Sequence, residues 1–331
     1  LPAAERVARE YLRARPKHAG ARYPLIDALA FQQRFDEARM LVTEVEEASG
    51  ATLGEYSVRA EMLIREGRLD EAEAYLLRII DATTGDDRAN ARWGYTILLR
   101  TQGRYREALV VADGLRARDA APPAPPAQKF WSAGMRAMIL HDMGRYTEVI
   151  ALRDSVIRVP FGFTPSRQAR STVGELANVA AARAALGDTA SLRAIATEVE
   201  RLGKLTDYAM HRRMYHYVAG LRLGLLGRHD EAAREIRASI YSSVSGFVRE
   251  NYELGRELIA AGKPREAVSV LSAALRGPVG AGGLSVTRPD IEMMLGRAHE
   301  LAADTAWAIA SYGRAVSAWE RADPGVARTR A

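Results

Sequence analysis

A six-residue motif recurs along the 331 residues of this chain and constrains its fold more than any other feature. The motif opens with a small residue, continues with two variable residues and an acidic pair, and closes with a small residue. Clear copies begin at Gln33, Gly67, Gly103, Gly144, Gly227 and Gly262, and degenerate copies begin at Gly187 and Ala303. Successive copies begin 34 to 43 residues apart, so the sequence predicts an array of one repeated unit.

A second small residue stands seven positions before every motif copy except the first, where Ile26 occupies that place. These residues are Ala60, Thr96, Ala137, Ala180, Gly220, Gly255 and Gly296. Two helices cross closely only where one side chain is small, and the residue that closes the motif fills the facing position. The opening Gly suits the left-handed end of a helix, and the acidic residues suit the first turn of the next one.

The motif resembles the tetratricopeptide repeat, a helix–turn–helix unit of 34 residues. The resemblance includes a bulky residue inside the motif, such as Phe35, Leu69, Tyr105 and Tyr146. The resemblance covers nearly the whole chain. It implies an all-α protein, an α–α superhelix of about eight repeats, with sixteen to eighteen helices and no sheet. The degenerate copies are expected to pack irregularly. The last part of the chain is more loosely similar to the repeat tails of bacterial multidomain regulators and Ser/Thr kinases.

Breaks in the spacing divide the chain into four parts. Residues 1–16 are expected to form a lone helix, which is an N-terminal cap or the remnant of an upstream repeat, and residues 17–116 form repeats one to three. Residues 117–127 contain four Pro and are predicted to be a non-helical surface linker. Residues 128–331 form repeats four to eight with a C-terminal capping helix.

Two further expectations concern the ends of elements. The connection between the fifth and sixth copies has no helix breaker, so a helix is expected to extend through Leu205 to Tyr208. The sequence begins with Leu1 rather than Met, and we expect upstream sequence, which would be a signal peptide, more repeats or another domain.

Composition excludes several classes of protein. No apolar stretch approaches the roughly 18–20 residues of a membrane-spanning helix. The absence of Cys excludes disulfides and thiolate sites, and it leaves both cytoplasm and periplasm open. The net charge is +6, but the basic residues are scattered among Asp and Glu, so nucleic-acid binding is not expected. Only four of the basic residues are Lys, a bias typical of GC-rich bacterial genomes.

Catalytic motifs are missing from the sequence. There is no phosphate loop, nucleophile elbow or His-Glu-x-x-His, and Gly280–Gly283 lacks the spacing of a dinucleotide-binding loop. We therefore predict no enzyme, no cofactor and no metal site. The rival hypothesis is an enzyme or small-ligand sensor that uses His141, Asp142 and Arg100 on the inner face of the array.

The resemblance also implies a binding groove, because the first helices of successive tetratricopeptide repeats line a concave surface. Carried over by register, the partner-binding residues would be Tyr23, Trp93, Arg100, Trp131, Tyr217, Arg249, Tyr252, Arg256 and Arg297. Aromatic and Arg side chains dominate binding hot spots. The alternative is that some of these aromatic residues are buried in the core.

The function that follows is a non-catalytic scaffold for one or more partner proteins in a larger bacterial assembly. One version is an extrinsic subunit that braces a membrane-protein complex. A second version is the regulatory or sensor region of a larger kinase or transcriptional regulator. The partner would bind in the groove or at the end and edge surfaces of the solenoid.

Overall fold

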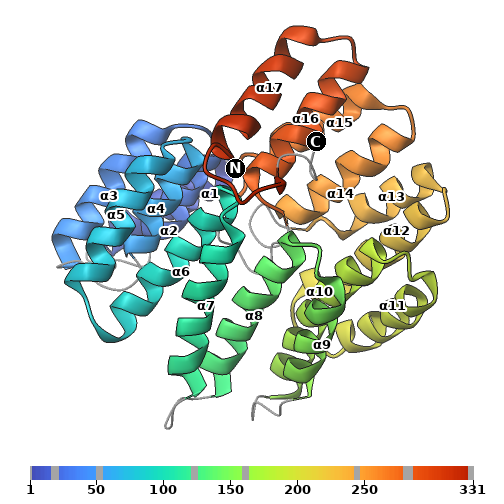
Figure 1. Ribbon diagram of the computed structural model, residues 1–331, viewed down its shortest axis with the longest axis horizontal. Coiled ribbons are helices and arrows are strands. Elements are labelled where there is room, and N and C mark those ends of the chain that lie inside the picture. Colours follow the sequence, from blue (N-terminus) through green and yellow to red (C-terminus); the bar gives the residue numbers. More distant parts are fainter. Residues whose placement is uncertain are drawn as a thin grey trace.

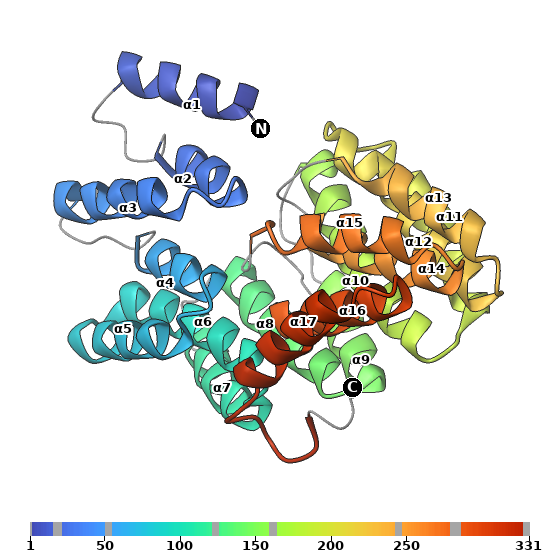
Figure 2. The ribbon, with the colours of Figure 1, turned by 90° about the horizontal axis from the view of Figure 1, so that it is seen from above.

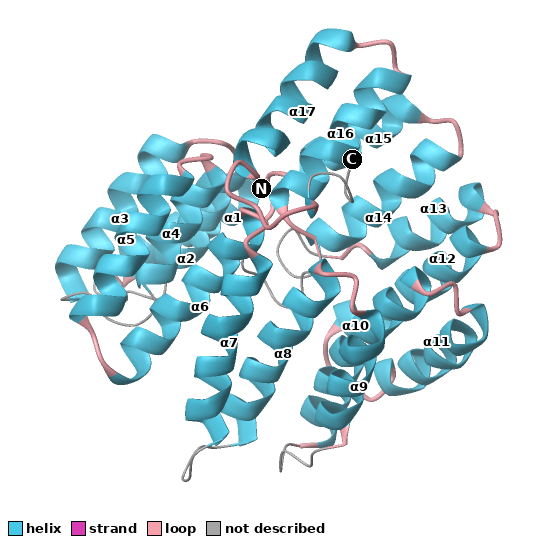
Figure 3. Ribbon diagram, in the orientation of Figure 1, coloured by secondary structure: helices cyan, strands magenta, loops and turns pink. Residues whose placement is uncertain are grey.

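The computed structural model describes residues 2–15, 22–49, 55–120, 126–158, 164–241, 247–278 and 286–326. These residues form 17 helices and no strand, which confirms the predicted all-α class (Figure 3). The helices are α1 (Pro2–Ala14), α2 (Arg22–Phe31), α3 (Phe35–Ser49), α4 (Glu55–Arg65), α5 (Leu69–Ala82), α6 (Gly85–Thr101), α7 (Tyr105–Ala120), α8 (Pro126–Asp142), α9 (Tyr146–Ile157), α10 (Pro165–Ala185), α11 (Thr189–Gly203), α12 (Ala209–Leu225), α13 (His229–Ser239), α14 (Phe247–Ala260), α15 (Pro264–Ala274), α16 (Arg288–Leu301) and α17 (Thr305–Ala318).

Each motif copy lies in the turn between two paired helices, from α2–α3 to α16–α17, and α1 precedes the first pair. The residue that opens the motif has a positive φ in all eight copies, between 60° at Gln33 and 78° at Gly67. The next backbone N–H bonds to a carbonyl five residues earlier, as from Arg104 to Leu99 at 2.9 Å, which is the Schellman end of a helix. The degenerate copies have the same turn, so the irregularity expected for them is not seen there.

The small residues lie where the paired helices cross. Ala72, Ala108, Ala232 and Ala267 are completely buried. A Cβ atom on Gly220 would lie 2.4 Å from the side chain of Ile236, closer than van der Waals contact allows. The close helix crossings that the sequence predicted are therefore confirmed.

The array curves so that its C-terminal end lies against the N-terminal half, near α6 and α7 (Figures 1 and 2). We call α1–α7 the N-terminal half and α8–α17 the C-terminal half. Figure 2 shows α17 crossing from the C-terminal half toward α7. Trp319, just after α17, is buried in the same apolar cluster as Leu99 of α6 and Met135 of α8. The rings of Phe31 in α2 and Phe247 in α14 also meet, with centroids 5.5 Å apart.

Two boundary predictions were wrong. The first concerns the predicted non-helical linker 117–127: helix α7 continues to Ala120 and α8 begins at Pro126, so both ends of this range are helical. Residues 121–125 lie outside the described residues. Helix α11 ends at Gly203 rather than extending through Tyr208. The Thr206 hydroxyl donates to the Gly203 carbonyl at 3.0 Å and forms a turn there. In the described parts of the chain, no helix is both long enough and apolar enough to cross a membrane.

Candidate interaction surface

The first helices carry the residues that the sequence assigned to a groove, and several of them are buried. Arg100 of α6 forms a bidentate ion pair with Asp142 of α8, from Nε to Oδ2 at 2.6 Å and from Nη2 to Oδ1 at 3.2 Å. Both side chains are almost inaccessible to solvent. His141, the third candidate of the enzyme hypothesis, packs edge-on against Tyr146. The Arg100–Asp142 pair therefore joins two neighbouring repeats.

Tyr217 and Arg249 form a second buried contact, between α12 and α14. The Arg249 guanidinium carbon lies 4.4 Å from the centroid of the Tyr217 ring, and Arg249 donates to Asn178 Oδ1 of α10 at 3.3 Å. Burial raises the pKa of the Tyr217 hydroxyl. Because Tyr217 is fully buried, the expectation that it faces an open groove is wrong, and the alternative of a core role is correct for this residue.

Arg256 of α14 remains partly exposed. It pairs with Glu253 Oε2 at 2.7 Å and with Glu257 Oε1 at 2.9 Å. Burial raises the pKa of the Glu253 carboxyl, although Arg256 acts against this. A cavity of about 450 Å³ lies beside these groups, and its lining includes His141, Tyr217, Tyr252, Arg256 and Asp323.

The other groove candidates have varied surroundings. Trp93 and Tyr252 are partly buried and pack against apolar clusters. Tyr23 is partly exposed, whereas Arg297 is exposed and pairs with Glu300 at 3.0 Å. The side chain of Trp131 lies outside the described part of the chain. The groove candidates whose side chains are described thus do not form one continuous open surface.

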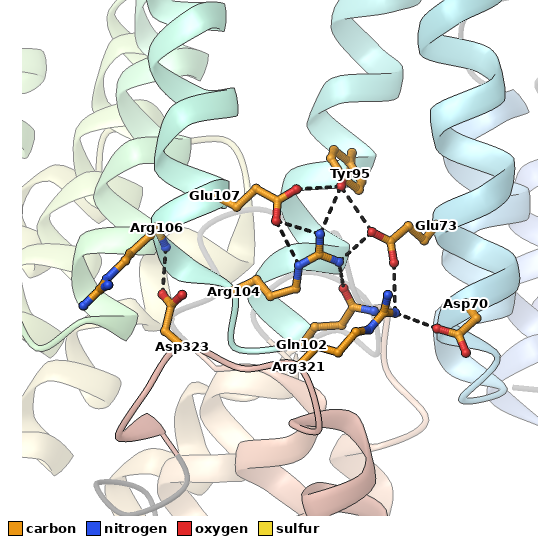
Figure 4. Close-up of polar contacts among 9 residues, drawn as sticks. All are labelled: Asp70, Glu73, Tyr95, Gln102, Arg104, Arg106, Glu107, Arg321 and Asp323. Atoms are coloured by element: carbon orange, nitrogen blue, oxygen red, sulfur yellow. Dashed lines mark hydrogen bonds and ion pairs between the residues drawn. The ribbon is translucent and has the colours of Figure 1, made fainter.

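A segment that the sequence did not single out closes the array. We call Trp319–Val326 the C-terminal segment. The Asp323 backbone N–H donates to the Gly103 carbonyl at 3.0 Å. Asp323 Oδ2 accepts from the Arg106 N–H at 2.9 Å (Figure 4). Arg106 is in the first turn of α7, so the Asp323 carboxylate caps this helix from a distant part of the chain.

Ion pairs surround this contact (Figure 4). Arg321 binds Asp70 at 2.6 Å and Glu73 at 2.9 Å. Arg104 binds the same Glu73 and also Glu107. The C-terminal segment thus joins an ion-pair network between α5 and α7.

The outer side of α17 is apolar and exposed. We call Ala306, Ile309, Gly313 and Val316 the α17 end face; Ile309 and Val316 are 66% and 58% exposed. In the repeat register these two residues correspond to Ile150 and Ile157 of α9, which pack in one cluster with Val179 and Ala182 of α10. The α17 end face therefore exposes positions that α9 buries against the next repeat.

This geometry defines a protein of stacked helical hairpins. No protein-family model and no curated protein matches the sequence. A chain in the crystal structure of the APC/C hetero-tetramer Cut9–Hcn1 is 13% identical with a TM-score of 0.50, and the match covers 98% of this chain and 57% of that chain. This protein thus spans just over half the length of that chain.

Two other solved structures are similar over most of this chain. A tetratricopeptide repeat protein from Parabacteroides merdae is 11% identical with a TM-score of 0.42, and the match covers 83% of this chain and 96% of that one. The human IFIT1 dimer with m7Gppp-AAAA is 15% identical with a TM-score of 0.43, and the match covers 94% of this chain and 79% of that one. The protein is a tetratricopeptide-like α solenoid, as its motif predicted.

Proposed function

We propose that this protein is a non-catalytic scaffold that binds a partner protein through the α17 end face. The observation that carries the proposal is the exposure of Ile309 and Val316 on the last described helix. The solvent-facing side of a solenoid helix is usually polar. An apolar outer face is instead typical of a surface that a partner covers.

The repeat register indicates what kind of surface would fit. The equivalent residues Val268 of α15 and Leu275, directly after it, pack in one cluster with Ile291 and Leu295 of α16. The natural occupant of the α17 end face is therefore an amphipathic helix that packs as the first helix of a further repeat would. Gly313 and Ala306 have little or no side chain, which allows such a helix to approach closely.

The test combines Ile309→Glu and Val316→Glu in one variant. The matched control is Val110→Glu, because Val110 is also an exposed Val on a second helix, with 73% of its surface accessible. Proteins captured from an extract of the source organism would be compared among wild type, variant and control, and the affinity of the main partner would then be titrated. We expect at least about tenfold weaker binding in the end-face variant alone. Equal binding by all three proteins would show that the partner binds elsewhere on the solenoid and not at the α17 end face.

For the larger context, we propose an extrinsic subunit that braces a bacterial assembly, in the cytoplasm or the periplasm, at the surface of a membrane complex. The rival is the regulatory or sensor region of a kinase or transcriptional regulator. The genomic sequence upstream of Leu1 discriminates between them, because a signal peptide favours the first and a kinase or DNA-binding domain favours the second.

A further inference from the structure

A cavity of about 330 Å³ lies where the two halves of the array meet, and we call it the junction cavity. Four arginines line it: Arg65 at the end of α4, Arg276 and Arg288 on either side of the α15–α16 connection, and Arg314 of α17. Among the described residues that line it, Glu292 is the only carboxylate. The wall of the junction cavity therefore carries an excess of positive charge.

Two of these arginines already have carboxylate partners. Arg314 forms a bidentate pair with Glu292, at 2.9 and 2.8 Å. Arg65 is buried but held loosely, with Asp27 and Glu61 oxygens 3.7 and 3.5 Å away and a bond of 3.4 Å to the Arg276 carbonyl. The buried Arg65 Nε has no hydrogen bond among the described residues.

The other two arginines have no carboxylate partner in the described structure. The Arg288 guanidinium donates to the Leu275 carbonyl at 2.6 Å and makes no ion pair within 4.0 Å. Burial lowers the pKa of Arg288 to about 10, and the charges of Arg65 and Arg314 act in the same direction, against Glu292. Arg276 is exposed at the rim. Two positive charges are thus left for a ligand to neutralise.

We propose that the junction cavity binds the phosphate group of a small molecule through Arg288, Arg65 and Arg276. A phosphate monoester carries about −1.5 to −2 charges at neutral pH, which matches the two unpaired guanidinium groups, whereas a carboxylate would neutralise only one. Guanidinium groups also bind phosphate oxygens in pairs. Arg65 is buried and Arg288 is partly buried, which favours a small ligand over an extended macromolecule.

The rest of the ligand has room beside the phosphate. A larger cavity of about 920 Å³ shares Arg65, Arg288, Glu292 and Arg314 with the junction cavity. The N-terminus of α16 is not itself the anion site, because Asp290 already accepts from the Thr287 N–H at 2.8 Å and from its hydroxyl at 2.7 Å. Since Arg65 belongs to one half and Arg288 to the other, the ligand would also hold the closed array together.

The experiment titrates the full chain with inorganic phosphate and pyrophosphate, and with acetate as the carboxylate probe, at constant ionic strength in a calorimeter. Arg288→Gln is the test variant. Arg297→Gln is the control, because Arg297 lies on the same helix, exposed and paired with Glu300. Saturable phosphate or pyrophosphate binding that weakens at least tenfold in Arg288→Gln alone supports the proposal.

Other outcomes overturn it. No saturable phosphate or pyrophosphate binding, or equal binding by Arg288→Gln, would mean that Arg288 only ties down the α15–α16 connection. Acetate binding tighter than inorganic phosphate binding would replace the phosphate by a carboxylate ligand. If circular dichroism shows that Arg288→Gln does not fold, the exposed Arg276→Gln takes its place, and unchanged affinity there rejects the site.

Discussion

His211 lies buried at the start of α12, with its ring edge-on to that of Tyr208. The positive charge of Arg170 also acts on it. Burial, aided by repulsion from Arg170, lowers the pKa of His211 from 6.5 to about 4. The unfolded chain therefore binds the proton first as the pH falls. The stabilising effect of a neutral His211 is complete above pH 6.5 and is lost as the pH drops toward 4.

This residue gives a pH prediction. The free energy of unfolding should fall by up to roughly 3 kcal/mol between neutral pH and about pH 4 because of His211 alone. His211→Gln has no such proton to bind and should lose that part of the acid-side decrease. Urea unfolding at both pH values measures it, and His216→Gln on the same helix is the control. A pH dependence identical in wild type and His211→Gln would contradict the buried neutral His.

The buried pair of Arg100 and Asp142 gives a second prediction at this scale. Arg100→Met would leave the Asp142 carboxylate buried without this guanidinium, which should cost about 3–5 kcal/mol. Adding Asp142→Leu should restore much of the loss, because two apolar side chains need no partner. Chemical unfolding of the single and double variants tests this. A double variant less stable than Arg100→Met would mean that Asp142 has a further stabilising role.

At the residue level, the sequence predicted the positions inside each repeat well, because helix crossing and turn geometry depend on neighbours a few residues away. Positive φ at every motif start is of this kind. The sequence did not predict that Arg249 covers Tyr217. The repeat register indicates which side of a helix a residue occupies, but not which residue packs against it.

At the scale of the elements, the C-terminal segment packs directly against one backbone position, Gly103. Gly103 has φ of 71° and Gly67 has φ of 78°, in the same turn of successive repeats. A Cβ on Gly67 would have no atom of the described residues within 4 Å, whereas a Cβ on Gly103 would lie 2.8 Å from the Ala322 Cβ. The two glycines thus form a matched pair for testing the contact.

Gly67→Ala should cost about 1–2 kcal/mol, the strain of a left-handed Ala. Gly103→Ala carries the same strain and also displaces the C-terminal segment, so it should cost more and should speed amide hydrogen exchange over residues 319–326. Thermal unfolding and exchange mass spectrometry measure the two effects. If both variants exchange alike in that segment, the contact with Gly103 does not hold it.

Element boundaries show where sequence patterns fail. The Pro-rich run predicted a break between repeats three and four, but α8 begins at Pro126, since Pro is well tolerated in the first turn of a helix. The absence of breakers predicted a helix through Tyr208, yet the chain turns at Thr206. Nothing in the sequence marks Gly103 among the motif glycines, because its special contact comes from residues more than 200 positions later.

For the whole molecule, the contacts between the two halves change what the tetratricopeptide resemblance implies about the binding surface. An open superhelix would offer its inner face to a partner, but here Trp319, Arg321 and Asp323 bind across to α5, α6 and α7. The buried Arg100–Asp142 pair and the Arg249–Tyr217 contact occupy positions that the resemblance assigned to the groove. Two exposed apolar side chains, Ile309 and Val316, share the outside of α17, and two arginines without a carboxylate partner among the described residues lie at the junction of the halves. These are therefore the surfaces on which function should be sought.

Closure itself is testable with two tryptophans near the same helix. Trp319 is buried against the N-terminal half, whereas Trp307 is 59% exposed. Trp319→Ala removes a buried aromatic side chain, which should cost about 3–5 kcal/mol. Because repeats pack mainly on their neighbours, the array should open rather than unfold. Small-angle scattering should show a larger radius of gyration for Trp319→Ala at unchanged helical content, and no change for Trp307→Ala. A destabilised Trp319→Ala that keeps the wild-type radius of gyration would show that other contacts, such as Phe31 with Phe247, are sufficient to hold the halves together.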